Sequence, residues 1–404
     1  MTVAAPAERR WPPEVVGLGR LAHRIFRGDD PSSIITELEL RLSADPSDAG
    51  AWFDLGVVHE LVFDKERGLA CQAQALKLSR VFRTPAERDT GLRLLMFAAP
   101  GDIATNVPVS FLLIDSDVTL DMVFLLPNEP SPDDVPDHDL AMIGACQSDA
   151  NEPVLAQLEA ELAEWPRPVL LSPAGIRSME RDRLWKLLDG APGVCIPPTV
   201  MLDREQVRAL AEDGAEVPVL SQRLAYPFLL RPLDSHGGHG LERIEAAADI
   251  AGYLERHPAD KFFWAPFVDY SGEDGLFRKY RVVMMDGKPF LCHVAIAAHW
   301  MLHYLNAGMD VDAAKRAEEE NAFATFDDVF AVRHAAALRA LYERSGSEYI
   351  TIDCAETRAG ELLIFEAGTA MVVHDMDPAD VFPYKGPNMR RVFAAFREFL
   401  GRRA

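Results

Sequence analysis

The pattern of apolar residues changes near residue 102, and this change constrains the fold more than any other feature of the sequence. Upstream of it, apolar residues such as Leu18 and Leu21 recur every three or four positions, which is the helical period. Downstream, short apolar and β-branched runs, for example 107–115 and 121–127, alternate with helix-like stretches. Short buried strands that alternate with helices are typical of α/β domains. The sequence therefore predicts an all-α segment followed by an α/β fold.

Turn signals and composition divide the chain into four predicted domains. A Pro- and Asp-rich stretch at 127–139 predicts a loop, and Asp286-Gly287 between two apolar runs predicts a hairpin turn. The expected order is a helical domain at 1–100, a first α/β domain at 101–200, a subdomain with a glycine-rich loop at 201–275 and a subdomain with a carboxylate-bearing hairpin at 276–404. With 404 residues, the chain is long enough for two or three domains that each bury a core.

The helical segment has the spacing of a two-helix repeat. Six residues occupy the defining positions of a tetratricopeptide repeat, namely Trp52, Leu55, Gly56, His59, Gly68 and Ala75. Residues 14–83 therefore resemble about two such repeats, and a generic helical hairpin is the alternative. Either arrangement suits contact with a partner protein or peptide, or with a second subunit of a homodimer, better than catalysis.

The charge balance excludes two classes of partner. The chain has 41 Lys and Arg residues against 63 Asp and Glu residues, which gives a formal net charge of −22. A chain with this charge is not expected to bind nucleic acid or an anionic membrane as its main partner. A local basic pocket for a phosphorylated ligand remains compatible with this balance.

The cysteines and the absence of long apolar runs indicate a cytoplasmic protein. Five cysteines are present, none of them in a CxxC pair, so a disulfide framework or a structural zinc site is not expected. No apolar run approaches the ~20 residues that a membrane-spanning helix needs. The first residues contain no apolar stretch after their charges, so no secretory signal is expected.

A strand-like run that opens into a glycine-rich loop is the first candidate functional motif. The strand at 226–232 carries Arg231, and the sequence SHGGHG follows at 235–240. Glycines allow backbone N–H groups to turn toward a polyphosphate, and a guanidinium group can hold its oxygens. The motif is neither a P-loop nor a GxGxxG fingerprint. A flexible surface turn is the alternative interpretation.

Two acidic residues at strand ends form the second candidate motif. Asp353 and Glu366 are separated by thirteen residues and one turn, so two antiparallel strands would place their carboxylates side by side. Paired carboxylates near a phosphate loop are what Mg²⁺ needs to bridge nucleotide phosphates. The alternative is one ordinary buried acid and one exposed acid at a turn.

Basic residues and histidines supply the remaining candidates. Arg281 ends a basic run, 278–281, which would present a cation to a transferring phosphoryl group or else is a solvated charge run. His299 and His303 are four residues apart and share one side of a helix or a strand. A metal pair, contacts to an acceptor substrate and satisfied core histidines all remain open for them. His374 follows the carboxylate hairpin and would reach the same cleft.

The order of these motifs resembles the ATP-grasp superfamily, in the branch akin to ribosomal-protein glutamate ligases, glutathione synthetases and D-alanine–D-alanine ligases. The resemblance covers about residues 102–385. The matching segments are Arg181–Arg183, Leu230–Pro232, 235–240, Ala265–Val268, Lys279–Arg281, Asp353 and Glu366–Gly368. The chain departs from the pattern in having arginine (Arg183, Arg231) where two lysines are expected, and Gly368 where the family has a metal-binding asparagine.

The resemblance implies a fold, a reaction and a set of site residues. The implied fold is a pre-ATP-grasp α/β domain followed by two α+β subdomains that clasp ATP. The implied reaction is ATP-dependent ligation of a carboxylate, in an amino acid or small peptide, to an amine through an acyl phosphate, with Mg²⁺ as cofactor. A nucleotide- or peptide-binding adaptor without turnover and a small-molecule kinase are the alternatives.

The implied roles are assigned residue by residue. ATP would be bound by Arg183, Arg231, Ser235, His236, Gly237, Gly238, His239, Gly240, Pro266, Phe267 and Val268. Arg281 would stabilise the transferred group, and Asp353 and Glu366 would bind the metal. The segment with His299, His303 and Asn306 has no counterpart in the family pattern, so substrate contacts of these residues and of His374 are a hypothesis from this sequence alone.

Overall fold

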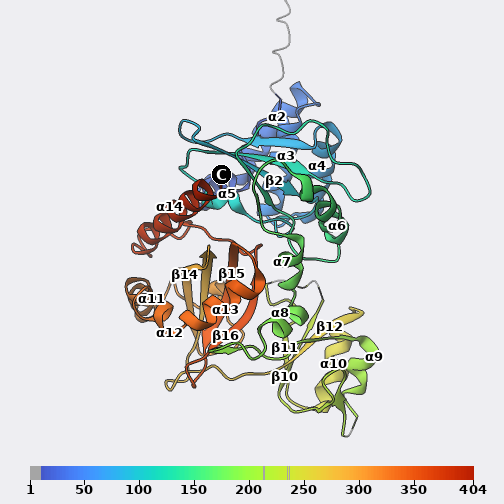
Figure 1. Cartoon of the computed structure of the whole chain (residues 1–404), viewed down its shortest axis with the longest axis vertical. Helices are drawn as coiled ribbons and strands as arrows, with labels where there is room; N and C mark the ends of the chain where they lie inside the picture. Colours follow the sequence, from blue (N-terminus) through green and yellow to red (C-terminus); the bar gives the residue numbers. More distant parts are fainter. Residues whose placement is uncertain (1–10, 213, 234, 236) are drawn as a thin grey trace, which may run out of the picture. The chain divides into compact units, whose positions relative to one another are not determined.

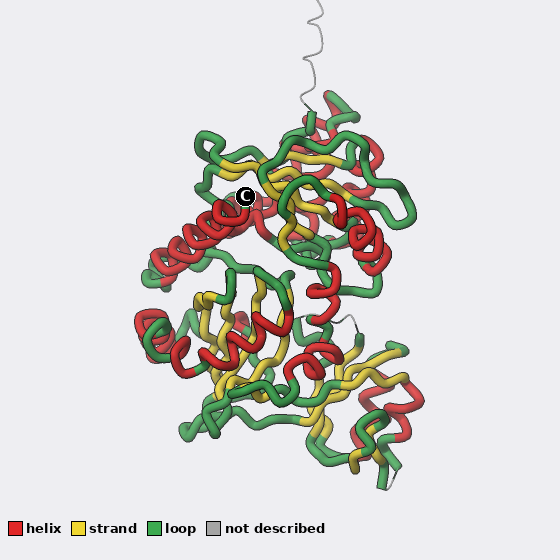
Figure 2. Tube along the Cα trace, in the orientation of Figure 1, coloured by secondary structure: helices red, strands yellow, loops and turns green. Residues whose placement is uncertain are grey.

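The computed structural model describes residues 11–212, 214–233, 235 and 237–404 (Figures 1 and 2). The chain forms two compact units. Unit 1 comprises the described residues up to Ile176, together with Ser347–Tyr349 and Thr369–Ala404. Unit 2 comprises Arg177–Gly346 and Ile350–Gly368. No helix of the described residues is long and apolar enough to cross a membrane.

Unit 1 begins with four helices and continues as an α/β sheet. Its helices are α1 (Leu18–Phe26), α2 (Pro31–Ala44), α3 (Ala49–Leu61), α4 (Lys65–Leu78), α5 (Val109–Leu112), α6 (Glu152–Glu161), the 3-10 turn η1 (Leu162–Glu164) and α14 (Lys385–Arg403). Its strands are β1 (Val81–Thr84), β2 (Leu92–Ala98), β3 (Val118–Phe124), β4 (Leu140–Ile143) and β5 (Val169–Leu170), in the sheet order β1-β3-β2-β4-β5. β2 pairs in parallel with both β3 and β4, and β1 is an antiparallel edge strand. The predicted α/β class is confirmed.

The helices α3 and α4 pack closely because two glycines face each other. A Cβ atom at Gly56 would lie 2.9 Å from the backbone oxygen of Gly68, and one at Gly68 would lie 3.0 Å from the oxygen of Gly56. Gly56 and Gly68 thus allow the close approach of α3 and α4 that the repeat-like spacing predicts. The assignment of 14–83 as tetratricopeptide repeats stays a prediction.

A buried aspartate joins α3 to the chain that precedes α1. Asp54 is 1% exposed, and its two carboxylate oxygens accept hydrogen bonds from the backbone N–H groups of Val16 (2.8 Å) and Gly17 (3.0 Å). Burial raises the pKa of Asp54 to about 6, although the two hydrogen bonds oppose this shift. The carboxylate therefore connects α3 to the residues just before α1, although burial makes its charged form unfavourable.

Replacing Asp54 with alanine is expected to destabilise the protein by about 2–4 kcal/mol, because two backbone N–H groups lose their acceptor. The folded pKa of Asp54, about 6, lies above the ordinary value of 3.8. Protonation of Asp54 therefore contributes stability that is fully present below pH 3.8 and is lost as the pH rises through 6. Urea denaturation at several pH values measures both effects. Asp30→Ala, which removes an exposed helix cap, is the control and is expected to lose clearly less stability than Asp54→Ala. Equal losses in the two variants would contradict the prediction.

Three boundaries differ from the sequence-based expectation. The first 100 residues are not helical throughout, because the segments of β1 and β2 pair with β3 and are almost wholly buried. The segment 107–115 is not a strand but contains the single-turn helix α5, which is apolar because it is buried, not because it is extended. The last helix, α14, belongs to unit 1 and not to the 276–404 subdomain: Phe396 packs on Tyr349, and Arg397 pairs with Asp117 of the same unit.

Unit 2 contains two main sheets, an antiparallel one and a larger one that includes the parallel pair β16–β6. Its helices are α8 (Arg181–Leu188), α9 (Arg204–Ala209), α10 (Ala247–Arg256), the 3-10 turn η2 (Tyr304–Asn306), α11 (Ala313–Thr325), α12 (Phe330–Arg333) and α13 (Ala335–Ser345), and α7 (Pro173–Ser178) leads into it from unit 1. Its strands are β6 (Val194–Cys195), β7 (Val200–Asp203), β8 (Glu216–Val217), β9 (Gln222–Arg223), β10 (Phe228–Pro232), β11 (Glu242–Ile244), β12 (Lys261–Pro266), β13 (Phe277–Met285), β14 (Lys288–Ala297), β15 (Tyr349–Glu356) and β16 (Leu362–Gly368). One sheet has the order β11-β10-β12-β7, and the other has the order β14-β13-β15-β16-β6.

Both sheets carry the elements that the sequence predicted. In the smaller sheet, β10 and β12 pair in an antiparallel register, and α9 and α10 pack against them around a core that includes Tyr253 and Phe262. In the larger sheet, the predicted turn at Asp286-Gly287 joins β13 to β14, and β15 and β16 form the predicted hairpin. The candidate motifs therefore lie on strands of both sheets within one unit.

Candidate active site

A cavity of about 250 Å³ in unit 2 collects most of the candidate residues; it is called the unit 2 cavity below. Six charged side chains line it: Arg181, Arg231, Lys279, Arg281, Asp353 and Glu366. Its other lining residues include Gly237, Gly238, Pro266, Phe267, Val268, Trp300, Met301 and His303. The four cations and two carboxylates leave a net charge of +2 in a chain whose overall charge is −22. The cavity is therefore an anion-binding environment.

The two carboxylates are direct cross-strand neighbours. Asp353 of β15 is the register partner of Glu366 of β16, and a β-bulge follows immediately. The flanking residues of both strands are mostly apolar and buried, so the strands themselves give the carboxylates little polar surrounding. The predicted side-by-side arrangement is present.

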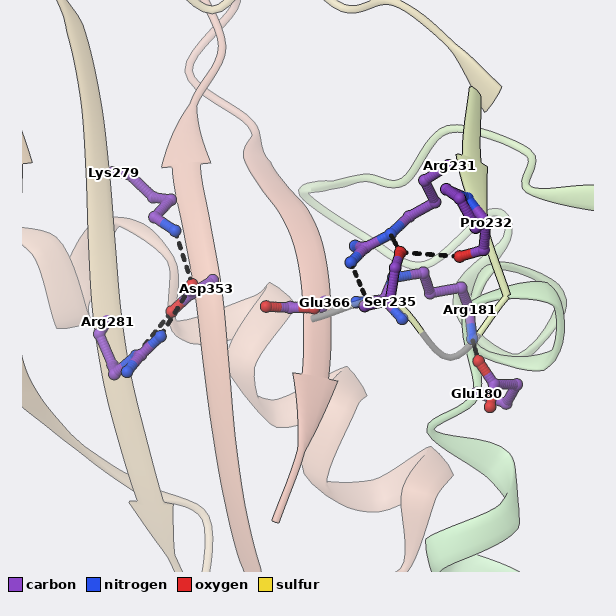
Figure 3. Close-up of polar contacts among 9 residues, drawn as sticks. All are labelled: Glu180, Arg181, Arg231, Pro232, Ser235, Lys279, Arg281, Asp353 and Glu366. Atoms are coloured by element: carbon purple, nitrogen blue, oxygen red, sulfur yellow. Dashed lines mark hydrogen bonds and ion pairs between the residues drawn. The ribbon is translucent and has the colours of Figure 1, made fainter. Parts of the chain in front are cut away.

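Two cations of the neighbouring strand β13 hold Asp353 (Figure 3). Lys279 Nζ donates to Oδ2 at 2.7 Å, and Arg281 donates from Nε to Oδ1 at 2.8 Å and from its terminal nitrogen to Oδ2 at 3.1 Å. The Asp353 side chain is only 2% exposed. Burial opposes its charge, but Arg281 and Lys279 outweigh burial and hold the pKa of Asp353 well below its usual value. Asp353 is therefore ionised and fixes both cations in place.

Glu366 is more accessible than Asp353 and faces a different cation. Its side chain is 32% exposed and accepts a hydrogen bond from Arg181. Burial raises the pKa of Glu366 and the charge of Asp353 adds to this, but Arg181 and Arg231 bring the pKa below its usual value. Glu366 is thus a charged carboxylate with an open side toward the cavity.

Arg231 brings a further positive charge to the same place. Its guanidinium group donates to Ser235 Oγ at 3.2 Å and to the backbone oxygen of Ser235, and Ser235 Oγ in turn donates to the oxygen of Pro232 at 2.7 Å (Figure 3). Burial and the nearby charge of Arg181 lower the pKa of Arg231 to about 10. A buried guanidinium group next to a second cation is a site that an anion would stabilise.

The glycine loop approaches the cavity at Gly238. This residue has φ +76, and a Cβ atom there would lie 2.4 Å from His303 Nε2. Gly237 also lines the cavity at φ +60, but its nearest neighbour would be 4.0 Å from a Cβ atom. Burial and the charge of Lys279 lower the pKa of His303, so its imidazole is neutral at pH 7.

Gly238→Ala is expected to weaken nucleotide binding by roughly tenfold or more, equivalent to about 1.4 kcal/mol. The methyl group both clashes with His303 and forces an L side chain into the left-handed region, which displaces the loop from the cavity. Gly237→Ala is the matched control because it has the same backbone strain without the clash. Titration of ADP into both variants measures the difference. Equal affinities in the two variants would show that the loop does not need this contact.

One end of the cavity is apolar. Pro266, Phe267 and Val268, for which the sequence analysis predicted contacts to ATP, line it at the point where β12 ends. The ring of Phe267 contacts both the guanidinium of Arg243, at 4.7 Å, and the indole of Trp300, whose ring centroid is 5.6 Å away. An aromatic base would find an apolar slot here next to the cationic region.

Several predicted site residues lie elsewhere. Arg183 is absent from the cavity lining and points to the backbone oxygen of Arg177. His299 and His239 are also absent from the lining, and Asn306 caps η2 by accepting from the backbone N–H of His303. His374 belongs to unit 1. His236 lies outside the described residues.

Arg181 and Lys279 are site residues that the sequence analysis did not assign. Arg181 and Arg183 are two positions apart at the start of α8, so they lie on different faces of the helix and only one can face the cavity. Lys279 and Arg281 are two positions apart in β13, so their side chains lie on the same side of the strand. The helical period could have separated Arg181 from Arg183, and the strand period could have grouped Lys279 with Arg281.

The carboxylate pair fits a divalent cation that is bridged to phosphates. Mg²⁺ usually takes one or two carboxylates and completes its shell with phosphates and water. Glu366 has an open side, and Asp353 accepts three described hydrogen bonds where a carboxylate offers about four acceptor positions. Among the residues that the structure describes, no group of three or more His, Cys, Asp or Glu side chains could hold a metal, and Gly368 supplies no ligand. Any metal here would therefore depend on the bound nucleotide for most of its ligands.

Comparisons with known proteins give similarities of fold. No protein-family model matches the chain, and no curated protein sequence is similar to it. A RimK domain ATP-grasp protein from Sphaerobacter thermophilus is 17% identical, with 74% of this chain and 98% of that chain covered and a TM-score of 0.39. VanG D-Ala:D-Ser ligase from Enterococcus faecalis is 12% identical, with coverages of 76% and 100% and a TM-score of 0.43.

A third solved structure is carboxyaminoimidazole ribonucleotide synthase from Aspergillus clavatus, in complex with ATP. It is 14% identical, with 57% of this chain and 53% of that chain covered and a TM-score of 0.38. The reaction proposed below rests on the contacts within the unit 2 cavity.

Proposed function

We propose that the protein binds ATP in the unit 2 cavity and is an ATP-dependent carboxylate–amine ligase of the ATP-grasp type. The observation that carries this proposal is the convergence of four cations, two carboxylates and two glycines on one cavity with an apolar end. A nucleoside triphosphate has the complementary parts, an apolar base and a chain of anionic phosphates. The excess of positive charge in an otherwise acidic chain matches that ligand.

The apolar slot and the cations support one orientation of the proposed nucleotide. The base lies against Pro266–Val268, and the phosphates extend toward Arg181 and Arg231. Gly237 and Gly238 allow the backbone to approach the phosphates without intervening side chains. Ser235 holds the guanidinium of Arg231 in position.

The proposed chemistry proceeds in two transfers. A substrate carboxylate oxygen attacks the γ-phosphorus of ATP, and ADP leaves, which gives an acyl phosphate. The amine of the second substrate then attacks the acyl carbon, loses a proton, and inorganic phosphate leaves with formation of the amide. Lys279 and Arg281 present positive charge to the transferred group, and Asp353 keeps both in fixed geometry.

A metal and a neutral histidine complete the proposed site. Glu366 and Asp353 would hold Mg²⁺, which supplies further neutralisation of phosphate charge when bound. His303 is neutral and lines the cavity, so it can accept a hydrogen bond from a substrate amine. An amino acid or small peptide is the proposed acid substrate. Contact of residues 14–83 with a partner protein or a second subunit is a separate proposal.

The test is ATP turnover in the presence of paired acids and amines. The purified chain is incubated with Mg²⁺, ATP and pools of amino acids, and ADP, phosphate and coupled products are followed by mass spectrometry. ADP with an amide product supports the ligase, and a phosphorylated product identifies a kinase instead. Nucleotide binding without any turnover would identify the adaptor that the loss of a metal ligand at Gly368 favours.

A further inference from the structure

Four of the six charged side chains that line the unit 2 cavity are fixed by contacts within the chain (Figure 3). Lys279 and Arg281 both donate to Asp353, whose side chain is only 2% exposed. Arg231 donates to the hydroxyl and backbone oxygens of Ser235, and this hydroxyl group is itself bonded to a backbone oxygen. A ligand that displaced any of these four side chains would leave a buried charge or a buried polar group without its partner, which is unfavourable.

The remaining two charged side chains, Arg181 and Glu366, are paired with each other. A terminal nitrogen of Arg181 donates to Glu366 Oε2. This is the hydrogen bond that the described part of the chain gives to the Arg181 guanidinium group. The two side chains are 20% and 32% exposed, and both line the cavity. The pair of Arg181 and Glu366 can therefore exchange partners while the other four charged groups keep theirs.

A β-bulge explains how Glu366 reaches the cavity. The register of β15 with β16 shifts directly after the pair of Asp353 and Glu366, so Phe365 is an extra residue in β16. Phe365 and Glu366 are neighbours in the sequence, yet both line the cavity, whereas a regular strand would point them to opposite faces. Arg181 is the first residue of α8. The ion pair therefore joins the start of α8 to the carboxylate hairpin within unit 2.

The guanidinium group of Arg181 occupies the carboxylate that a metal ion would need. In the arrangement that the structure shows, both carboxylates of the cavity are bonded to cations. Like charges repel, so a divalent cation alone would have to displace Arg181 from Glu366 and enter a region with an excess of positive charge. Phosphate groups would remove both obstacles, because they accept hydrogen bonds from a guanidinium group and neutralise the excess charge.

We propose that Arg181 is a switch that couples the metal to the nucleotide. Arg181 pairs with Glu366 until phosphates bind; its hydrogen bond then passes to a phosphate oxygen, and Glu366 becomes free for Mg²⁺. This inference rests on the proposed binding of ATP and adds an order of binding to it, nucleotide before metal. Coupling between two binding equilibria is reciprocal, so phosphates raise the affinity for metal by the same factor by which metal raises the affinity for phosphates.

Binding of Mn²⁺ to the chain without nucleotide tests the first half of the switch. Mn²⁺ prefers the same oxygen ligands as Mg²⁺, and its binding is followed by electron paramagnetic resonance. We expect Arg181→Gln to bind Mn²⁺ at least about tenfold more tightly than the parent, because Glu366 no longer has a competing cation. Arg231→Gln is the matched control: it removes the same charge from the cavity but leaves Glu366 paired, so its gain should be clearly smaller. Equal gains in the two variants would mean that only the net charge matters and would overturn the switch.

Titration of ADP in the presence of a chelator tests the second half. Glu366→Gln should tighten ADP binding, because Arg181 is then released toward the phosphates. The same substitution changes the net charge equally in an Arg181→Gln background, where no switch is left to release. We expect the gain in ADP affinity to be at least about threefold larger in the parent background than in the Arg181→Gln background. Equal gains in both backgrounds would contradict the switch.

The results separate the switch from the proposed function. If the parent binds ADP and Arg181→Gln leaves the Mn²⁺ affinity unchanged, the nucleotide site stands and the switch is overturned. If the parent does not bind ADP, the proposed function and the switch both fail. The circular dichroism spectra of all variants should match that of the parent, which shows that a changed affinity does not come from loss of the fold.

Discussion

Glu366→Gln is expected to lower ATP turnover by at least about 100-fold, equivalent to roughly 2.7 kcal/mol of transition-state stabilisation. The substitution keeps the shape of the side chain but removes the negative charge that faces both the cavity and Arg181. A neutral amide is a weaker ligand for Mg²⁺ and a weaker partner for the cation. Initial rates of ADP formation with saturating ATP and Mg²⁺ measure the effect.

A second measurement separates loss of catalysis from loss of the fold or of binding. Removing one negative charge raises the net charge of the cavity, so ADP measured in the presence of a chelator should bind Glu366→Gln at least as tightly as the parent. The melting temperature should change little, because the partly exposed carboxylate is replaced by an isostere. Turnover at the parent rate would mean that this hairpin is not the metal site and would favour the adaptor.

Asp353→Asn is expected to destabilise unit 2 by about 3–5 kcal/mol, because it leaves two largely buried cations without their counter-ion. Lys279 and Arg281 have side chains that are only 11% and 20% exposed, so water replaces little of the lost interaction. At about 2–4 °C per kcal/mol for a domain of this size, the transition should shift by roughly 6–20 °C. Differential scanning calorimetry measures the shift.

The pH dependence gives an independent check on Asp353. Its folded pKa is depressed below the ordinary value of 3.8, so its contribution is fully present above that pH and is lost as the pH falls toward the folded pKa. The difference between Asp353→Asn and the parent should therefore shrink below pH 3.8. Asp274→Asn is the matched control, because its ion pair with Arg278 is exposed and screened by water and is expected to contribute much less than the buried contacts of Asp353. Equal shifts in both variants would contradict the prediction.

The sequence predicted those features that depend on local pattern. The turn at Asp286-Gly287, the hairpin that carries Asp353 and Glu366, and the loop at 235–240 each have a signal within a few residues. The close approach of α3 and α4 was also readable, because only a residue without a side chain fits at Gly56 and Gly68. Short-range spacing determined these features, since strand and helix periods fix which side chains share a face.

The predictions from the sequence were wrong for features that depend on residues far away in the chain. The segments of β1 and β2 look apolar to any local window, and they are strands because β3 pairs with them. The last helix, α14, belongs to unit 1 because Arg397 pairs with Asp117, 280 residues earlier in the chain, and Phe396 packs on Tyr349 of the same unit. No local pattern contains that information.

The site shows the same division between local and distant information. The sequence alone determined that one chain carries a glycine loop, a basic strand and two strand-end carboxylates. Only the tertiary structure decided that Arg181 and not Arg183 faces the cavity, and that Asp353 is held by Lys279 as well as by Arg281. The physical reason is that buried charges must be neutralised by whichever side chains the packing of separate elements brings within hydrogen-bonding distance. That choice is made by the packing of α8, β13, β15 and β16, and the contact between Arg181 of α8 and Glu366 of β16 joins residues 185 positions apart in the chain.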